Sequence, residues 1–119
     1  MSYVDNYILP IAKKNLAAYK RMSKKAGKIW KEHGALAYKE CVAEDIKIKG
    51  LGRFDKTLKC KANETVVFAY VLYKSRKHRD LVNAKVMSDP RLHKICNPQN
   101  VPFDVKRMVY GGFKAFVDL

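Results

Sequence analysis

The stretch "TVVFAYVLYK", residues 65–74, constrains the fold of this 119-residue chain more than any other feature. β-Branched and aromatic residues fill it, which is typical of a strand. Side chains of a strand point alternately to its two faces, and here both sets are apolar. One set is Thr65, Val67, Ala69, Val71 and Tyr73, and the other is Val66, Phe68, Tyr70 and Leu72. Both faces of this strand must therefore be covered.

The other elements follow from periodicity and from turn residues. Residues 11–34 predict a helix that ends at Gly34, because one stripe of residues recurs at helical spacing. That stripe contains Leu16, Tyr19, Met22, Ala26, Ile29, Trp30 and His33. Ser75 is expected to cap a second helix that runs to about Met87 and is broken near Pro90. The remaining strands are predicted at residues 2–9, ended by Pro10, at 35–45 and within 102–119, and residues 53–59 predict a short helix or an ordered flap.

The order strand-helix-strand-strand-helix-strand predicts an α+β fold and a single domain over residues 1–119. Right-handed crossovers then give an antiparallel sheet of strand order 4-1-3-2, with both helices on one face. Helices on one face leave the other face open, whereas residues 65–74 are apolar on both sides. Pairing of two sheets in a homodimer is the simplest way to cover the second face.

Composition narrows the functional classes. The chain has 25 Lys and Arg against 11 Asp and Glu, a net charge of +14, which attracts polyanions such as nucleic acids. No apolar run approaches the roughly 20 residues of a membrane span, and the start lacks the pattern of a secretory signal, so we expect a cytoplasmic protein without membrane contact. Three cysteines without a C-x-x-C pair fit reduced thiols. No metal or cofactor is expected, because His93 and Cys96 lack further ligands at zinc spacing.

Positive charge is concentrated on the first predicted helix, opposite its apolar stripe. The candidate polyanion-binding residues are Lys20, Arg21, Lys24, Lys25, Lys28 and Lys31. Non-specific binding of RNA or another polyanion is one interpretation of this face, and a solvated helix surface is the other. Sequence-specific reading is not expected, because residues 64–73 lack the basic-Gly start of an RNA-recognition strand.

Asp5 lies between Tyr3 and Tyr7 on one face of the first predicted strand, which pairs with the last one. The candidate pocket residues on these two strands are Asp5, Tyr7, Arg107 and Tyr110. An acid among tyrosines beside an arginine could orient a small polar substrate and act as a general base. A structural ion pair at a strand end is the alternative. Glu40 is a weaker candidate that could equally be an exposed charge of an edge strand, and no catalytic residue is assigned.

Several motifs resemble the YbaA-like family, bacterial proteins of this length that form a domain of unknown function. The motifs are "YVDNYIL", "EHGAL" followed by "EC", "ETVVFAYV", "MSDPR" and "PFDVKRMVYGGF". The resemblance covers almost the whole chain, and its poorest match lies between Ile46 and Ala62. It implies a ferredoxin-like subunit that pairs as a dimeric α/β barrel, and it implies no established reaction. Related dimeric barrels often hold a ligand between the sheet and its helices or inside the barrel.

Gly111 and Gly112 interrupt the last predicted strand. Glycines within a strand usually mark a bulge, a bend or the close approach of another backbone. We expect a bend where the strand curls around the barrel and another backbone passes close, with Tyr110 and Phe113 flanking the dimer seam. Replacement of Gly112 by Val is then expected to damage dimerisation.

Overall fold

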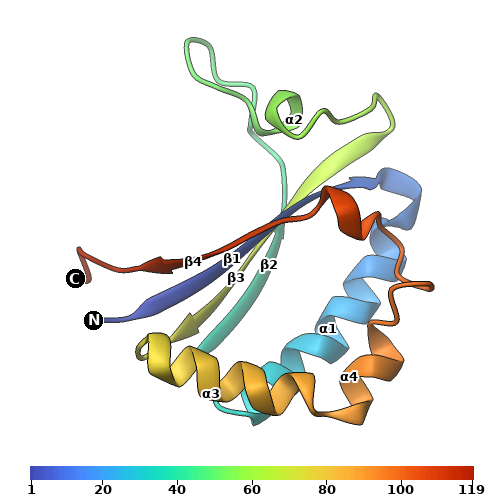
Figure 1. Ribbon diagram of the computed structural model, residues 1–119. Coiled ribbons are helices and arrows are strands. Elements are labelled where there is room, and N and C mark those ends of the chain that lie inside the picture. The colour runs from blue at the N-terminus through green and yellow to red at the C-terminus, as the bar shows by residue number, and fades with distance from the viewer.

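The computed structural model describes residues 1–119 and consists of one sheet with helices packed against one side (Figure 1). The strands are β1 (Tyr3–Ala12), β2 (Ala37–Val42), β3 (Glu64–Tyr73) and β4 (Val109–Lys114). The helices are α1 (Leu16–Glu32), α2 (Phe54–Thr57), α3 (Arg76–Met87) and α4 (Pro90–Ile95), with short 3-10 helices at Lys13–Asn15 and Val105–Arg107. The predicted α+β class is confirmed.

The sheet order is β2-β3-β1-β4, which confirms the predicted order 4-1-3-2 read from the other edge. All neighbouring strands are antiparallel. β1 and β3 pair along their whole length, from Tyr3 opposite Tyr73 to Ala12 opposite Glu64. The strand that is apolar on both faces therefore lies in the middle of the sheet, next to β1, and β2 and β4 form the edges.

One of the two prolines named in the prediction, Pro10, lies differently from what was expected. β1 continues through Pro10 to Ala12 instead of ending at Pro10. β4 reaches only as far as Ile8 of β1, so β1 has no neighbour on that side at Pro10, and a proline is tolerated there. The predicted second helix is confirmed, because α3 follows its Ser75 cap and ends at Met87. Pro90 then begins α4, because a proline suits the first turn of a helix. Asp89 caps this turn by accepting a hydrogen bond from the backbone N–H of Arg91 at 2.9 Å.

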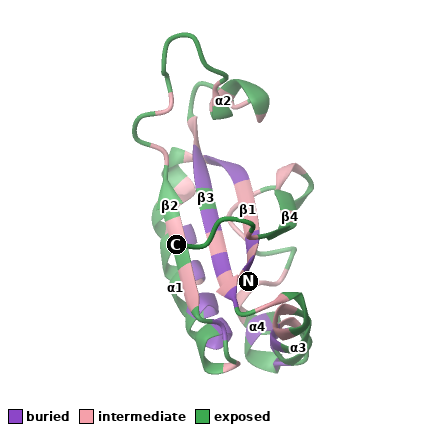
Figure 2. Cartoon of the chain, turned by 90° about the vertical axis from the view of Figure 1, so that its left-hand side faces the viewer, coloured by how far each residue is buried: buried purple, intermediate pink, exposed green.

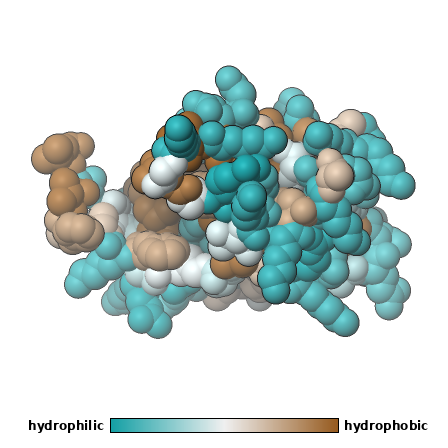
Figure 3. All heavy atoms as spheres, turned by 90° about the horizontal axis from the view of Figure 1, so that it is seen from above, coloured by the Kyte–Doolittle hydropathy of each residue, from teal (hydrophilic) through white to brown (hydrophobic).

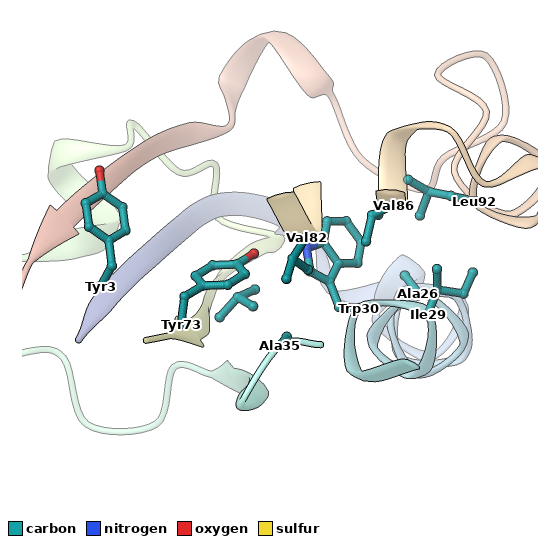
Figure 4. Packing of buried hydrophobic residues seen from close by; sticks show 10 residues of the cluster. Tyr3, Ala26, Ile29, Trp30, Ala35, Tyr73, Val82, Val86 and Leu92 are labelled. Atoms are coloured by element: carbon teal, nitrogen blue, oxygen red, sulfur yellow. The ribbon is translucent and has the colours of Figure 1, made fainter. Parts of the chain in front are cut away.

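The core lies on the helix-facing side of the sheet. Its buried residues concentrate on the two central strands, β1 and β3, and on α1 (Figure 2). The main cluster surrounds Trp30 of α1, which packs between the sheet and α3 (Figure 4). Its members are Tyr3, Ala26, Ile29, Trp30, Ala35, Val71, Tyr73, Val82, Val86 and Leu92. A smaller cluster further along the sheet contains Leu9, Ile11, Tyr19 and Val67. The predicted stripe of the first helix is thus buried at Tyr19, Ala26, Ile29 and Trp30.

The other face of the sheet has no layer of long helices (Figure 1). Phe68 of β3 lies on this face, together with Val109 and Phe113 of the edge strand β4. Phe68 is 40% exposed, Val109 53% and Phe113 59%, which are high values for large apolar side chains. The expectation that helices cover only one face of the sheet is therefore confirmed.

The connection between β2 and β3 projects beyond the sheet as an arm and carries α2 (Figure 1). Residues 53–59 were predicted to form a short helix or an ordered flap, and α2 confirms the helix. α2 begins at Phe54, whose side chain shares an apolar hollow with Phe68 at the base of the arm. No helix of the chain is both long and apolar enough to cross a lipid bilayer.

The paired glycines of β4 form no bulge. Gly111 pairs with Asn6 and Gly112 with Asp5 in an unbroken ladder, and neither glycine has a positive φ. Within the subunit, a side chain lies close to Gly112. A Cβ on residue 112 would lie 2.8 Å from Cε2 of Tyr3. Gly112 is needed because it leaves room for the ring of Tyr3.

Candidate ligand-binding cavity and basic groove

A cavity of about 230 Å³ lies between α1, the helix-facing side of the sheet and the segment 96–108. Its lining is apolar apart from a few polar groups, which is typical of ligand sites in proteins. The lining residues are Tyr7, Tyr19, Met22, Ser23, Ala26, Trp30, Tyr38, Glu40, Ala69, Cys96, Pro98, Val101, Phe103, Val105 and Met108. The sheet supplies the floor through Tyr7, Ala69 and Glu40, which lie on three adjacent strands in register.

The polar end of this cavity is a carboxylate held between two tyrosines. Tyr19 of α1 donates to Oε1 of Glu40 at 2.6 Å, and Tyr38 of β2 donates to Oε2 at 2.6 Å. Burial raises the pKa of both tyrosines above their usual range, and the Glu40 charge raises it further. Both tyrosines therefore keep their protons at neutral pH, and the Tyr19–Glu40–Tyr38 group is a fixed acceptor at the wall of the cavity.

Two aromatic side chains of the wall connect the cavity to the rest of the core. The ring of Tyr7 packs against Tyr110, with 4.8 Å between centroids, and burial raises the pKa of Tyr7. Trp30, the only tryptophan of the chain, donates from Nε1 to Oδ1 of Asn83 at 3.3 Å. Cys96 also lines the cavity, and burial, together with Glu40, raises the pKa of its thiol.

Asp5 is fully buried and takes part in a structural network next to the cavity. Its Oδ1 accepts from Nη1 of Arg79 at 3.0 Å, and its Oδ2 accepts from Nδ2 of Asn83 at 3.4 Å. Arg79 also donates to the hydroxyl groups of Tyr110 at 2.6 Å and Tyr3 at 3.3 Å. Both carboxylate oxygens of Asp5 are therefore paired, which is the alternative to catalysis that the sequence left open.

The predicted pocket around Asp5 is not formed. Arg107 belongs to the 3-10 helix before β4 and makes two bonds to Glu64, at 2.7 and 2.9 Å. The Arg107 guanidinium lowers the pKa of Glu64 to about 2. Of the predicted pocket residues, Asp5 and Tyr110 are joined through Arg79, Tyr7 lines the cavity instead, and Arg107 lies apart from all three. The alternation that placed Arg107 in the last strand failed because that strand starts only at Val109.

Arg79 was not predicted for the Asp5 network, and Glu40 was named only as a weaker candidate. Arg79 was hidden in the charged run "KSRKHRD", where nothing distinguishes the one arginine that turns inward. Glu40 faces α1 and the cavity and is partly buried, since it lies opposite Ala69 on the helix side. One signal was available, because Tyr38 and Glu40 alternate with Lys39, so both had to lie on the same face of β2.

A second concavity, of about 640 Å³, runs along the edge of the molecule between α1 and β2. We call it the basic groove, and it is lined by Lys20, Ser23, Lys24, Gly27, Lys28, Lys31, Glu32, Tyr38 and Glu40. Arg21 and Lys25, also predicted for a polyanion face, do not line it. Seen from above, hydrophilic residues dominate the side of the molecule on which α1 lies, whereas hydrophobic residues gather at the opposite end (Figure 3). The structure brings no three His, Cys, Asp or Glu side chains together in a cluster that could hold a metal ion.

Comparison with known sequences identifies the family. The profile described as "Protein of unknown function (DUF1428)" matches residues 2–105. The chain belongs to this family. It is 40% identical over 118 residues to "Uncharacterized protein YbaA" of Escherichia coli strain K12, and the match covers 99% of both chains. The resemblance of the DUF1428 chain to the YbaA-like family is thereby confirmed.

Solved structures with little sequence identity share the fold of the DUF1428 chain. A NIPSNAP family protein with unknown function from Agrobacterium tumefaciens has a TM-score of 0.62 at 18% identity, over 96% of this chain and 87% of that one. SnoaB, a cofactor-independent oxygenase from Streptomyces nogalater, has a TM-score of 0.62 at 10% identity, over 99% and 96%. A dimeric ferredoxin-like protein from an uncultured marine organism has a TM-score of 0.52 at 11% identity, over 99% and 96%. These likenesses show a ferredoxin-like fold.

Proposed function

We propose that each subunit binds one small, mainly apolar molecule in the cavity beside Glu40 and that the ligand donates a hydrogen bond to this carboxylate. The observation that carries the proposal is the Tyr19–Glu40–Tyr38 group at the wall of an apolar cavity. A carboxylate has about four acceptor sites, so two tyrosine donors leave capacity for a further donor from a ligand. A hydroxyl or amine on an apolar body matches this arrangement.

The volume of the cavity supports a ligand of one or two rings. An apolar cavity of about 150 Å³ holds benzene in another protein, and this one measures about 230 Å³. Tyr7, Trp30 and Phe103 provide aromatic surface in its lining, which favours a flat ligand. SnoaB is an oxygenase of the same fold, but a likeness at 10% identity supports no reaction for this chain.

Isothermal titration calorimetry with 1-naphthol and 1-methoxynaphthalene tests this proposal, because the two probes differ in one hydrogen-bond donor. We expect 1-naphthol to bind and its methyl ether to bind about 10- to 150-fold more weakly, since a hydrogen bond to a charged group contributes about 1.5–3 kcal/mol. Ala69→Leu fills the floor of the cavity and should abolish binding of both. Ala84→Leu, on the exposed side of α3, is the matched control. Failure of both probes, or undiminished binding to Ala69→Leu, would overturn the proposal.

We also propose that the subunit forms a homodimer through the uncovered face of its sheet. The exposed apolar side chains Phe68, Val109 and Phe113 support this, and so does the ferredoxin-like neighbour that is described as dimeric. Sedimentation equilibrium should give the mass of a dimer. Phe68→Asp should give a folded monomer, whereas Leu81→Asp, at an exposed position of α3, should leave the dimer intact. A wild-type monomer at micromolar concentration would contradict the assembly.

A cytoplasmic location is proposed on the state of the cysteines. Cys41, Cys60 and Cys96 are all free, as expected for a compartment that keeps thiols reduced. Fractionation of cells that express a tagged chain tests the location, and recovery of the tag outside the cytoplasm would contradict it.

A further inference from the structure

Arginine and lysine have different roles in this subunit. Every ion pair has an arginine or a histidine as its cation, and the acids involved are Asp5, Glu32, Asp55, Glu64, Asp80 and Asp89. Lysines supply most of the positive charge of the chain, 19 of its 25 Lys and Arg residues, and none of them is paired with a carboxylate. The excess charge of the protein is uncompensated wherever lysines gather.

The lysines gather in a line along the basic groove. Lys20, Lys24 and Lys28 are spaced four residues apart on α1, so they lie one above another on the same side of the helix, and Lys31 continues the row. The row is about 16 Å long, at a rise of about 1.5 Å per residue. Like charges at this spacing repel one another and weaken the helix, and a bound anion would relieve that repulsion.

The acids that line the groove do not neutralise this row. Glu32 is bound by Arg91 at 2.6 Å, outside the lysine row. Glu40 accepts from two tyrosines and makes no ion pair with a lysine. Lys31 donates to the carbonyl oxygen of Leu36 at 2.8 Å, which fixes one ammonium group at the end of the groove without removing its charge.

We propose that the basic groove binds the phosphate backbone of a single strand of nucleic acid without reading its bases. A row of cations fits a linear chain of anions better than a single compact anion. Sequence-specific recognition of single-stranded RNA stacks bases on aromatic side chains and forms hydrogen bonds to the base edges. Tyr38 is the one aromatic residue of the groove; its ring packs against Gly27 and its hydroxyl group is bound to Glu40, so it offers no stacking surface. The groove shares Ser23, Tyr38 and Glu40 with the wall of the proposed ligand cavity, but the four lysines of the row do not line that cavity.

Fluorescence anisotropy with labelled U12 RNA and dT12 DNA tests the proposal. Four lysine contacts predict a slope of about −2.8 for log K against log salt, so affinity should fall about 50-fold between 50 and 200 mM salt. Lys24→Gln/Lys28→Gln removes two contacts and should halve this slope to about −1.4. Affinity for U12 and dT12 should agree within a few-fold, because neither the base nor the 2′-hydroxyl is read.

Lys77→Gln/Lys85→Gln is the matched control, since it removes the same charge from exposed positions of another helix, α3. It should keep the wild-type slope, and circular dichroism should show that both double variants are folded. If both double variants lost affinity equally, binding would depend on net charge alone, which would overturn the assignment of binding to the groove. Absence of binding at 50 mM salt would overturn the proposal, as would binding to phosphatidylglycerol vesicles but not to U12.

Discussion

Tyr3 occupies the space that a side chain on residue 112 would need. A Cβ there would lie 2.8 Å from Cε2 and 2.9 Å from Cζ of the Tyr3 ring. The guanidinium carbon of Arg79 lies 4.9 Å from the centroid of the same ring, in cation–π contact. β1, β4 and α3 therefore meet at one ring, and the glycine of β4 is what allows this contact.

Gly112→Ala should lower the free energy of unfolding by about 1–3 kcal/mol, because the added methyl group overpacks the contact with Tyr3. Gly111→Ala is the control, since a Cβ there would meet Phe113 Cε1 at an ordinary 3.4 Å. We expect a change within about 0.5 kcal/mol for the control. Urea unfolding measures both, and equal stability of the two variants would contradict the role assigned to Tyr3. The loss is expected within the subunit and not first at a dimer seam.

Arg79→Met should destabilise the fold by about 3–5 kcal/mol, because it leaves the buried carboxylate of Asp5 without its charged partner. Arg53→Met removes an ion pair whose side chains are 29% and 24% exposed and should have a much smaller effect, because solvent screens such a pair. Chemical denaturation of the two variants compares the loss of stability for the buried Arg79–Asp5 pair with that for the partly exposed Arg53–Asp55 pair. A small effect of Arg79→Met would mean that Asp5 is not held as a charge by this contact.

Glu64 makes stability depend on pH in the acid range. Its pKa in the folded protein is about 2, below the ordinary value of 4.5, so its contribution is complete above pH 4.5 and is lost as the pH falls toward 2. Glu64→Gln should therefore be less stable than wild type at pH 7, by about 1 kcal/mol for a partly exposed pair, and equal to it near pH 2. Urea titrations at several pH values check this, and a difference that is constant with pH would contradict it.

Cys96 should report on the cavity by its reactivity. Burial raises the pKa of its thiol, so alkylation by iodoacetamide at pH 8 should be slow, and 1-naphthol should slow it several-fold further. Cys60 lies outside the cavity and is the internal control, whose rate should not change. Mass spectrometry resolves the two sites. If the alkylation rate of Cys96 did not change at saturating 1-naphthol, the probe would bind outside this cavity.

The fold could be predicted well because its signals are local and repeated. Strand alternation, the stripe on α1 and the Ser75 cap, which accepts from His78 N at 3.1 Å, each act over a few residues, and handedness rules then leave one sheet order. The prediction that Pro10 ends the first strand was wrong, because the tolerance of a strand for proline depends on neighbouring strands that the sequence does not show. Pro10 is acceptable because the pairing of β1 with β4 ends at Ile8 opposite Val109, so no strand needs a hydrogen bond from residue 10 on that side.

The candidate site was predicted poorly because it depends on side chains that are far apart in the chain. Asp5 was recognised as special, but its true partners, Arg79 and Asn83, lie on α3, which turns them toward the sheet. Periodicity identifies the buried face of a helix, but it does not show which polar residue at its margin will turn inward. The same holds for Glu40, whose role appears only when Tyr19 approaches from α1.

Because arginines form the ion pairs and lysines carry most of the excess charge, the surface charge of this subunit can change without a change in its interior packing. Substitutions that alter the isoelectric point of this subunit can fall on lysines that hold no other part of the structure in place. Relatives can therefore diverge widely in surface charge while they keep the same interior, so the electrostatic character of a member of this family has to be read from its own lysines.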